Sequence, residues 1–283
     1  MGQPRATKDS AKRVAKELSL IVNRNYNGDS VCHLGACHLL TCDIFIRSYH
    51  KDFLWLSNCL KSIDRYCHGF AETVLAVPNS SYGSVGILRD LGQRIVVCKD
   101  YQDDYLGQQV TKLYADEYCG ADYICHVDSD CLFYRDVFPE DLIFEGKPVI
   151  ALTAYDELPD DRVWKGITGR FLGRTLHANF MRRQPMVFPR WIYGELRNYT
   201  EGLHGTDLEA YVISQPPRGF SEFDALGGYA YTFHRDLFQW LTLRANEPNE
   251  TVCKWYWSWG GITSQIAKEI ALVLSLDSDP RRL

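Results

Sequence analysis

Short apolar runs alternate with helical stripes of apolar residues along the first half of the chain. Runs of about five residues rich in valine, isoleucine, leucine and cysteine indicate strands, because such side chains suit a buried sheet. Between these runs, apolar residues recur every three or four positions, which is the spacing of one helix face. The pattern predicts strands at residues 42–46, 73–77, 94–98 and 122–127, and helices near residues 53–63, 83–91 and 106–118.

This order of elements predicts the fold class. Each strand is followed by a helix, so successive strands can lie parallel with helices on both faces of the sheet. We therefore expect an α/β fold with a Rossmann-like, mainly parallel sheet, which binds ligands at the carboxyl ends of its strands. After residues 149–153 the alternation fades, and aromatic, glycine and arginine residues become more frequent. The prediction is a single domain, residues 1–283, with a sheet half at 40–154 and an irregular half at 155–283.

The first 38 residues predict an N-terminal arm that contains one helix. Residues 1–24 carry six lysine and arginine side chains, and apolar residues recur at helical spacing between Val14 and Val22. The favoured interpretation is a helix packed on the domain. A peripheral contact with an anionic membrane or a partner is the alternative, because a basic amphipathic stretch is only suggestive of one.

Composition and charge exclude some function classes. The formal net charge of −5 argues against nucleic-acid binding, which needs a basic face to neutralise phosphates. No run approaches the ~20 apolar residues of a membrane helix, and the N-terminus is too polar for a secretory signal, so we expect a cytoplasmic protein. Most of the ten cysteines are then expected to be buried thiols. Cys32, Cys37 and Cys42 recur every five residues, but this spacing matches no usual zinc pattern, and their role stays open.

Asp128-Ser129-Asp130 directly follows the fourth predicted strand. On an extended backbone, residues two apart point to the same side, so both carboxylates can share one hard cation. Mg²⁺ and Mn²⁺ suit such an oxygen-rich site and would neutralise a departing diphosphate. The alternative is a solvated turn. The buried strand before the motif and the apolar residues 131–133 after it favour a binding site.

The segment at residues 107–138, GQQVTKLYADEYCGADYICHVDSDCLFYRDVF, resembles the centre of the GT-A-fold glycosyltransferases. In that superfamily a helix precedes the strand that carries the D-x-D motif, which binds the metal, the ribose and the diphosphate of a nucleotide sugar. GFSEFDALGGYAY at residues 219–231 is similar to a Ser-Glu-aromatic segment in a little-characterised group of bacterial and viral members. The resemblance covers about residues 40–235. It implies a nucleotide-sugar-binding half at 40–154 and an acceptor-binding half at 155–283.

The resemblance also implies roles for particular residues. Asp130 is expected to bind the metal, Mn²⁺ or Mg²⁺, while Asp128 contacts the ribose and shares the metal, with Ser129 beside it. Many members have a third ligand, often a histidine, in the C-terminal half; His234 is our candidate, and His177 is also available. The remaining nucleotide contacts are expected from the ends of the first two strands and from the helix before the motif: Arg47, Ser48, Tyr49, Pro78, Asn79, Gln109 and Lys112.

Lys112 and the aromatic run at residues 255–259 each have two interpretations. Lys112 can reach the diphosphate as a point charge, or it can form a surface pair with Asp116 four residues further along the helix. A strand would place the three tryptophans of the run on one face, as a sugar-binding platform or as a wall of the core.

Glu222 and Asp224 are the candidates for a catalytic base. An inverting transferase needs a carboxylate that removes a proton from the attacking acceptor hydroxyl, as in an inverting glycosidase. Both acids lie at the start of a predicted helix that Ser221 can cap, so helix capping is their alternative role. In the GT-A pattern the base lies at such a helix start, and we rank Glu222 before Asp224. If neither is the base, a retaining mechanism becomes the better hypothesis.

The sequence therefore predicts a metal-dependent glycosyltransferase. It would move a hexose or pentose from a nucleotide-diphosphate sugar, with a UDP-sugar favoured, to a glycan or another hydroxyl acceptor, with inversion favoured. A haloacid-dehalogenase-like phosphatase also uses D-x-D after a strand, but Leu132 stands where that family has threonine or valine. A non-catalytic nucleotide-sugar-binding protein is the third hypothesis, and the presence of both acidic motifs argues against it.

Overall fold

The computed structural model describes residues 40–88, 91–158, 164–246 and 251–275. The predicted basic arm, together with Cys32 and Cys37, lies outside these ranges, whereas Cys42 is a buried thiol in the first strand. Within the described ranges, no helix has both the length and the apolar character that a membrane crossing requires.

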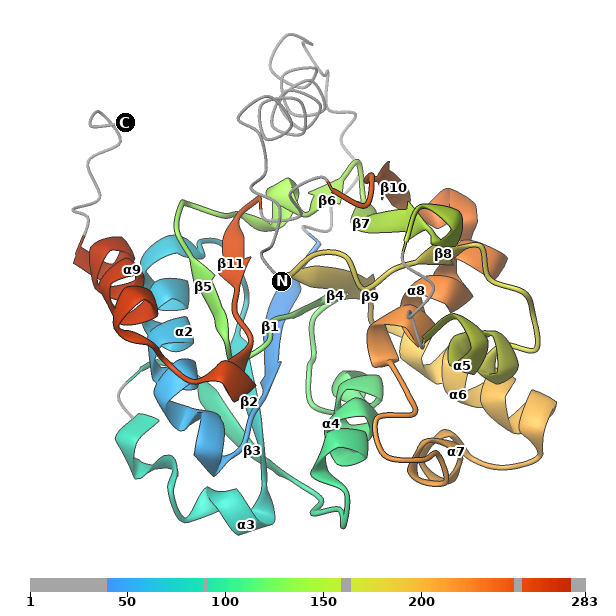
Figure 1. Cartoon of the computed structure of the whole chain (residues 1–283), viewed down its shortest axis with the longest axis horizontal. Helices are drawn as coiled ribbons and strands as arrows, with labels where there is room; N and C mark the ends of the chain where they lie inside the picture. Colours follow the sequence, from blue (N-terminus) through green and yellow to red (C-terminus); the bar gives the residue numbers. More distant parts are fainter. Residues whose placement is uncertain (1–39, 89–90, 159–163, 247–250, 276–283) are drawn as a thin grey trace, which may run out of the picture.

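Strands and helices alternate regularly up to β4 and become irregular in the second half (Figure 1). The strands are β1 (Cys42–Arg47), β2 (Thr73–Pro78), β3 (Arg94–Cys98), β4 (Tyr123–His126), β5 (Cys131–Phe133), β6 (Ile143–Phe144), β7 (Lys147–Ala154), β8 (Ala178–Asn179), β9 (Met186–Pro189), β10 (Gln239–Thr242) and β11 (Cys253–Trp255). The α-helices are α2 (Phe53–Tyr66), α3 (Asn79–Tyr82), α4 (Asp104–Leu113), α5 (Trp164–Phe171), α6 (Trp191–His204), α7 (Leu208–Ile213), α8 (Glu222–Phe233) and α9 (Ser264–Ser275).

The main sheet has the order β3-β2-β1-β4-β9. Its first four strands are parallel, and β9 runs antiparallel to β4. A second sheet has the order β10-β7-β6, and β5 pairs antiparallel with β11. The prediction of an α/β fold with a mainly parallel sheet is confirmed.

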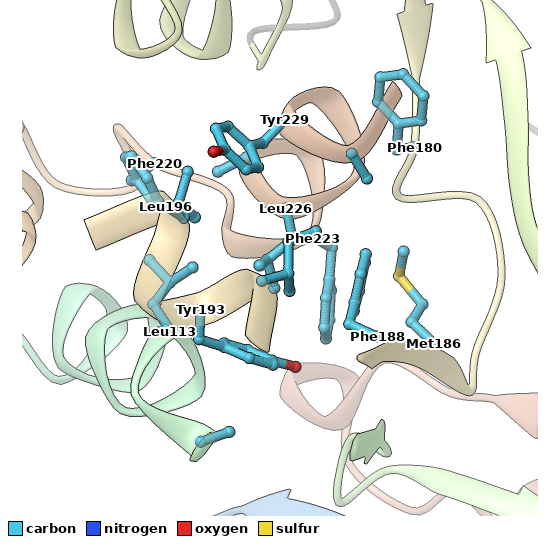
Figure 2. Packing of buried hydrophobic residues seen from close by; sticks show 14 of the residues in the cluster. Leu113, Phe180, Met186, Phe188, Tyr193, Leu196, Phe220, Phe223, Leu226 and Tyr229 are labelled. Atoms are coloured by element: carbon cyan, nitrogen blue, oxygen red, sulfur yellow. The ribbon is translucent and has the colours of Figure 1, made fainter. Parts of the chain in front are cut away.

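The two faces of the main sheet pack against different helices. Ile44 and Ile46 of β1 belong to a buried cluster with Leu56 and Leu60 of α2, whereas Phe45 belongs to a second cluster that includes residues of α4, α6 and α8. This alternation follows from the two-residue period of a strand. Figure 2 shows part of the second cluster, in which large side chains of α6, α8 and β9 point toward one another. This cluster holds α8 close to α4, and the site described below lies between these two helices.

Two predicted helices differ in extent from the observed ones. In place of a helix at 83–91, α3 begins directly after Pro78, and a short 3₁₀ turn spans Val85–Leu88. The start of α3 is held by Asp100, which accepts hydrogen bonds from the backbone N–H and hydroxyl of Ser80. Such a cap from another segment leaves no local sequence pattern. The helix predicted at 106–118 begins earlier, at Asp104, because the side chain of Asp103 caps it, and it ends at Leu113.

Candidate functional site

The carboxyl ends of β1 and β4 meet where the strand order changes direction. From β1 the chain adds β2 and β3 on one side of the sheet, then crosses over to place β4 on the other side of β1. Open α/β sheets bind ligands outside the strand ends at such a switch point. β1 ends at Arg47, and β4 continues through Val127 into the Asp128-Ser129-Asp130 turn. The topology therefore places the acidic turn at the edge where a ligand is expected.

A buried lysine joins the acidic turn to α8. Lys112 Nζ donates to Asp128 Oδ1 at 2.6 Å and to Glu222 Oε1 at 2.7 Å. The side chains of Lys112 and Glu222 are 5% and 3% exposed. Burial alone would lower the pKa of Lys112, but the two carboxylates raise it above its ordinary value, so the ammonium stays charged. Three residues that the sequence marked separately thus form one cluster.

The alternative role of Lys112, a surface ion pair with Asp116, is wrong. Asp116 instead accepts two hydrogen bonds from the guanidinium of Arg197, at 2.7 and 2.6 Å. The direction of Lys112 is set by the packing of α4 on β1 and α8, which buries the helix face that carries it.

Gln109 fixes the start of α8 against α4. Its Oε1 accepts a hydrogen bond from the backbone N–H of Glu222 at 2.8 Å, and Ser221 caps α8 by accepting from the Asp224 N–H at 3.3 Å. The ring of Phe223 lies 4.7 Å from Lys112 Nζ, a distance at which a cation is attracted to an aromatic face. The carbonyl oxygen of Gln109 therefore positions the candidate base, and its expected contact with a nucleotide remains a prediction.

Asp130 has different surroundings from Asp128. Its Oδ1 accepts from the indole N–H of Trp255 at 3.2 Å, and its Oδ2 accepts from the backbone N–H of Ser258 at 2.9 Å. Burial and the neighbouring charge of Asp128 raise the pKa of Asp130 to about 7. Within the described ranges no lysine or arginine pairs with Asp130. Its hydrogen-bond donors in the described structure are therefore both neutral, and Lys112 acts on it only across a longer distance.

The chemistry of the turn fits a hard divalent cation bound together with a ligand. Two carboxylates within one turn supply oxygen atoms, and Mg²⁺ typically uses one or two protein carboxylates and completes its shell with phosphates and water. Gln184 adds a polar group: its Nε2 donates to Asp128 Oδ2 at 3.2 Å, while its Oε1 is buried and has no hydrogen-bond partner in the described structure. A buried amide oxygen without a partner is unusual unless a ligand or ion satisfies it.

His234 does not lie with the two aspartates. His234 is the residue directly after α8. Its Nε2 lies 2.8 Å from Glu195 Oε2, and its ring packs on Trp191 with 4.8 Å between ring centroids. Among the described residues, no group of three or more histidine, cysteine, aspartate or glutamate side chains is placed to hold a metal ion. The assignment of His234 as the third ligand beside Asp128 and Asp130 is therefore wrong. Helix α8 carries it away from the turn.

Asp224 is a structural carboxylate and not a candidate base. Both of its oxygens accept from Asn179 Nδ2, and Oδ1 also accepts from the backbone N–H groups of Phe180 and Met181 at 2.7 and 3.3 Å. Full burial raises the pKa of Asp224 to about 6. Gly227 permits this close approach, because a Cβ there would lie 2.7 Å from Phe180 Cγ. Asp224 thus anchors the segment after β8 to α8, and Glu222 remains the candidate.

Residues at the ends of β1 and β2 are at the expected edge, but one of them has a structural contact. The guanidinium of Arg47 forms two hydrogen bonds with the carboxylate of Asp104, one of them 2.9 Å long, and so ties the end of β1 to the start of α4. Ser48 is buried and its hydroxyl has no partner among the described residues, while Tyr49 and Asn79 are at least partly exposed. Pro78 is the buried end of β2. Nucleotide contacts by these residues, and by Ser129, remain predictions.

Three residues of the site were not predicted. Gln184 lies before β9 and has no motif around it, so no local signal could have identified it. Trp255 and Ser258 belong to the aromatic run that the sequence did mark, but nothing in the run indicates contact with Asp130. The strand expected there ends at Trp255 and is followed by a 3₁₀ turn at Ser258–Gly260. That turn directs the Ser258 N–H to the carboxylate.

A surface cavity of about 340 Å³ lies away from this cluster. It is lined by Asp116, Asp122, Arg190, Trp191 and Gly194. Asp122 directly precedes β4 and Arg190 directly follows the antiparallel β9, so the cavity lies at the opposite end of these strands from the Asp128 turn. It contains none of the residues of the acidic cluster.

Comparison with solved structures finds distant likenesses. The 4-diphosphocytidyl-2C-methyl-D-erythritol synthase of Anaerococcus prevotii DSM 20548 is 12% identical, with a TM-score of 0.41 over 83% of this chain and 95% of that chain. The glycosyltransferase GlyE of Streptococcus pneumoniae TIGR4 is 14% identical, with a TM-score of 0.37 over 71% of this chain and 45% of that chain. The match thus spans less than half of GlyE. Likenesses this distant assign no activity.

Comparison with known sequences places the chain in a family whose description names no activity. No curated protein matches the chain. A family model does match over residues 49–260, a range that contains Lys112, the acidic turn, Glu222 and the aromatic run. The chain belongs to this family, which is described as a family of unknown function (DUF6492).

Proposed function

We propose that the protein is a metal-dependent glycosyltransferase of the GT-A type. It would transfer a sugar from a nucleotide-diphosphate sugar, with a UDP-sugar favoured, to the hydroxyl of a glycan or another acceptor, with inversion. The observation that carries the proposal is the cluster in which Lys112 contacts both Asp128 and Glu222. It joins the D-x-D turn to a buried carboxylate from a segment 94 residues later in the chain, at the switch point of a parallel sheet.

The candidate base has surroundings that suit proton transfer. Burial raises the pKa of Glu222, while the ammonium of Lys112 acts in the opposite direction. A carboxylate is a better base when its pKa moves toward the working pH and it still remains ionised. In the proposed reaction the acceptor hydroxyl attacks the anomeric carbon, its proton passes to the Glu222 carboxylate, and the bond to the diphosphate breaks. Lys112 is a positioning residue that keeps Glu222 and Asp128 in place.

Asp128 and Asp130 would hold the divalent cation. When bound, Mn²⁺ or Mg²⁺ supplies the positive charge that a leaving diphosphate requires. Asp130 is the firmer of the two ligands, because in the described structure it has no charged partner of its own, whereas Asp128 already pairs with Lys112.

Thermal-shift measurement tests this proposal directly. A ligand that binds only the folded protein raises its melting temperature. We expect UDP, GDP, dTDP or their sugars to raise it with Mn²⁺ or Mg²⁺ present, and to have little effect with EDTA. Asp130→Asn should abolish the cation-dependent part of the shift. Asp64→Asn, a change on helix α2 away from the turn, is the matched control and should behave like the wild type.

A turnover assay then separates the hypotheses. Release of nucleoside diphosphate from a nucleotide sugar, dependent on an added glycan, would support transfer. Hydrolysis of a phosphate ester without nucleotide binding would support the phosphatase instead. Cation-dependent binding of a nucleotide sugar, with no turnover on a panel of acceptors, would support a binding protein. If no nucleoside diphosphate raises the melting temperature with either cation, the proposal is wrong.

A further inference from the structure

The segment at residues 253–261 carries aromatic side chains on two sides, and one side is built into the protein. Lys254 Nζ and the Tyr256 hydroxyl both bind Glu269 of α9, at 2.6 and 3.1 Å. The Tyr256 ring also packs on Trp55 of α2, with 5.4 Å between centroids. These contacts fix the backbone of the segment to two helices.

The other side of the segment faces the acidic turn. Trp255 donates its indole N–H to Asp130, and Trp257 stacks on Trp255 with ring centroids 5.2 Å apart and planes 26° apart. The Tyr256 N–H also donates to the Asp130 carbonyl, at 3.0 Å. We call the two stacked indoles, Trp255 and Trp257, the indole platform. One of its rings is a single hydrogen bond away from the carboxylate proposed to hold the cation.

The outer ring of the platform, Trp257, is exposed although it is held in place. Trp257 is 57% exposed and Trp259 is 82% exposed, whereas Tyr256 is buried and Trp255 is half-buried against the core. Large aromatic side chains usually bury most of their surface, and exposed apolar surface next to polar groups marks a binding site more often than chance. A wall of the core, the other interpretation of this run, does not fit Trp257 and Trp259, whereas Trp255 packs against a buried cluster. Because the ring pair is already ordered, little conformational freedom would be lost when it binds a ligand.

We propose that the indole platform binds the apolar face of a sugar ring, with Trp257 as the contact surface. An aromatic face offers apolar contact, and the Asp130 carboxylate beside it can accept hydrogen bonds from hydroxyl groups. A pyranose presents both features, a face of C–H groups and a rim of hydroxyls. The proposal rests on the proposed function for the role of this sugar, which is either the transferred sugar of the donor or a ring of the acceptor glycan.

Position favours a sugar over a nucleobase. In a nucleotide sugar the transferred sugar is bonded directly to the diphosphate, whereas the base is separated from it by the ribose. The platform contacts Asp130, the residue proposed to hold the cation and thereby the diphosphate. A ring that stacks there is therefore next to the diphosphate, which is the place of the sugar.

Fluorine NMR of the full chain labelled with 5-fluorotryptophan tests the proposal one ring at a time. The chain has seven tryptophans, and Trp257→Phe assigns the resonance of Trp257. The probes are the methyl glycosides of glucose, galactose, N-acetylglucosamine and xylose, then UDP with Mg²⁺, then UDP-glucose and UDP-galactose with Mg²⁺. We expect a glycoside or a UDP-sugar to shift the Trp257 resonance and UDP alone to leave it unchanged.

The pattern of shifts identifies the source of the sugar. A response to a methyl glycoside assigns the platform to an acceptor ring, and a response to a UDP-sugar but not to UDP assigns it to the transferred sugar.

Trp257→Ala should weaken the binding of whichever probe shifts the resonance about tenfold, since stacking contributes that order of affinity. Trp257→Phe should keep most of it. Trp191→Ala, a change at an exposed tryptophan on α6, is the control and should bind the probe normally.

Two outcomes would overturn the proposal. If UDP alone shifts the Trp257 resonance as strongly as UDP-sugars do, the platform holds the base. If no glycoside or UDP-sugar shifts the resonance, the platform is not a sugar site. Failure of the proposed function would give a different result. UDP with Mg²⁺ would then not raise the melting temperature, while a glycoside could still shift the Trp257 resonance.

Discussion

The two carboxylates of the acidic turn lie two residues apart and are held in opposite ways. Asp128 is paired with the ammonium of Lys112 and with the amide of Gln184, so it is tied to α4 and, through Lys112, to α8. Asp130 receives only neutral donors, the Trp255 indole at the end of β11 and the Ser258 N–H shortly after it.

This difference indicates that the two ends of the turn are suited to different roles. At the Asp128 end, one ammonium serves two carboxylates inside a packed interface, so the geometry is fixed before any ligand arrives. At the Asp130 end, no lysine or arginine of the described structure pairs with the carboxylate, and the nearby ring of Trp257 is exposed. The first end is suited to positioning a base, and the second to receiving a cation and a sugar.

Glu222→Gln should have the largest effect and tests the Asp128 end. Glutamine keeps the size of the side chain but cannot accept a proton, so we expect transfer to fall by roughly 10²- to 10⁴-fold. Cation-dependent nucleotide binding should persist, because Asp128 and Asp130 are unchanged. The measurement is acceptor-dependent release of nucleoside diphosphate, compared with the melting-temperature shift. Transfer at the wild-type rate would remove Glu222 from its role.

Lys112→Met should have the next largest effect, on stability. It leaves the buried carboxylate of Glu222 and the partly buried carboxylate of Asp128 without their counter-charge, which typically costs about 3–5 kcal/mol. Urea denaturation at neutral pH measures the loss. Lys99→Met is the matched control: its pair with Glu209 is much more exposed, and we expect a loss of about 1 kcal/mol or less. Equal losses of unfolding free energy in both variants would mean that the Lys112 cluster stabilises the fold no more than an ordinary ion pair does.

Asp224 should produce a pH dependence of stability. Burial raises its pKa from 3.8 to about 6 in the folded protein, so the folded state binds the proton more tightly than the unfolded chain does. The resulting stabilisation is complete below about pH 4 and is lost as the pH rises through about 6; it amounts to about 3 kcal/mol.

Asp224→Asn checks this dependence. The free energy of unfolding, measured in urea between pH 4 and pH 7, should lose the part of its slope that Asp224 contributes. The variant should be less stable than the wild type near pH 5, because an asparagine cannot accept all the hydrogen bonds from Asn179, Phe180 and Met181. Transfer by the folded fraction should stay close to normal. A loss as deep as that of Glu222→Gln would restore Asp224 as a base.

The sequence was sufficient for the sheet and for the position of the turn. Strand and helix periods are local, so the runs at β1 to β4 and the apolar stripes of α2 and α4 could be read directly. The place of Asp128–Asp130 followed from the strand before it. Lys112 and Glu222 were both marked, but their contact was not, because a sequence pattern does not show that residues 110 positions apart meet.

The errors have the same physical origin. Glu222 and Asp224 lie in one helix turn with the same capping signal, and only the packing of α8 decides that one faces Lys112 and the other faces Asn179. His234 was chosen by residue type, yet it lies at the far end of α8, a helix of 12 residues. The link between Asp130 and Trp255 spans 125 positions and depends on the β5–β11 pairing.

Trp255→Phe should have the smallest effect and tests the Asp130 end. Phenylalanine keeps a ring for Trp257 to stack on but removes the N–H that binds the Asp130 carboxylate, and a hydrogen bond to a charged group contributes about 1.5–3 kcal/mol. We expect urea denaturation to show a loss near the lower end of this range without cation. The loss should shrink with Mg²⁺ and UDP, because a bound cation would stabilise the Asp130 carboxylate, which the indole N–H no longer binds.

Trp240→Phe is the matched control: its indole binds the neutral carbonyl of Arg235, so its loss should be about 1 kcal/mol and independent of cation. If the two variants respond to Mg²⁺ alike, Asp130 is no more dependent on a cation than any neutral acceptor, and the contrast between the two ends of the turn fails.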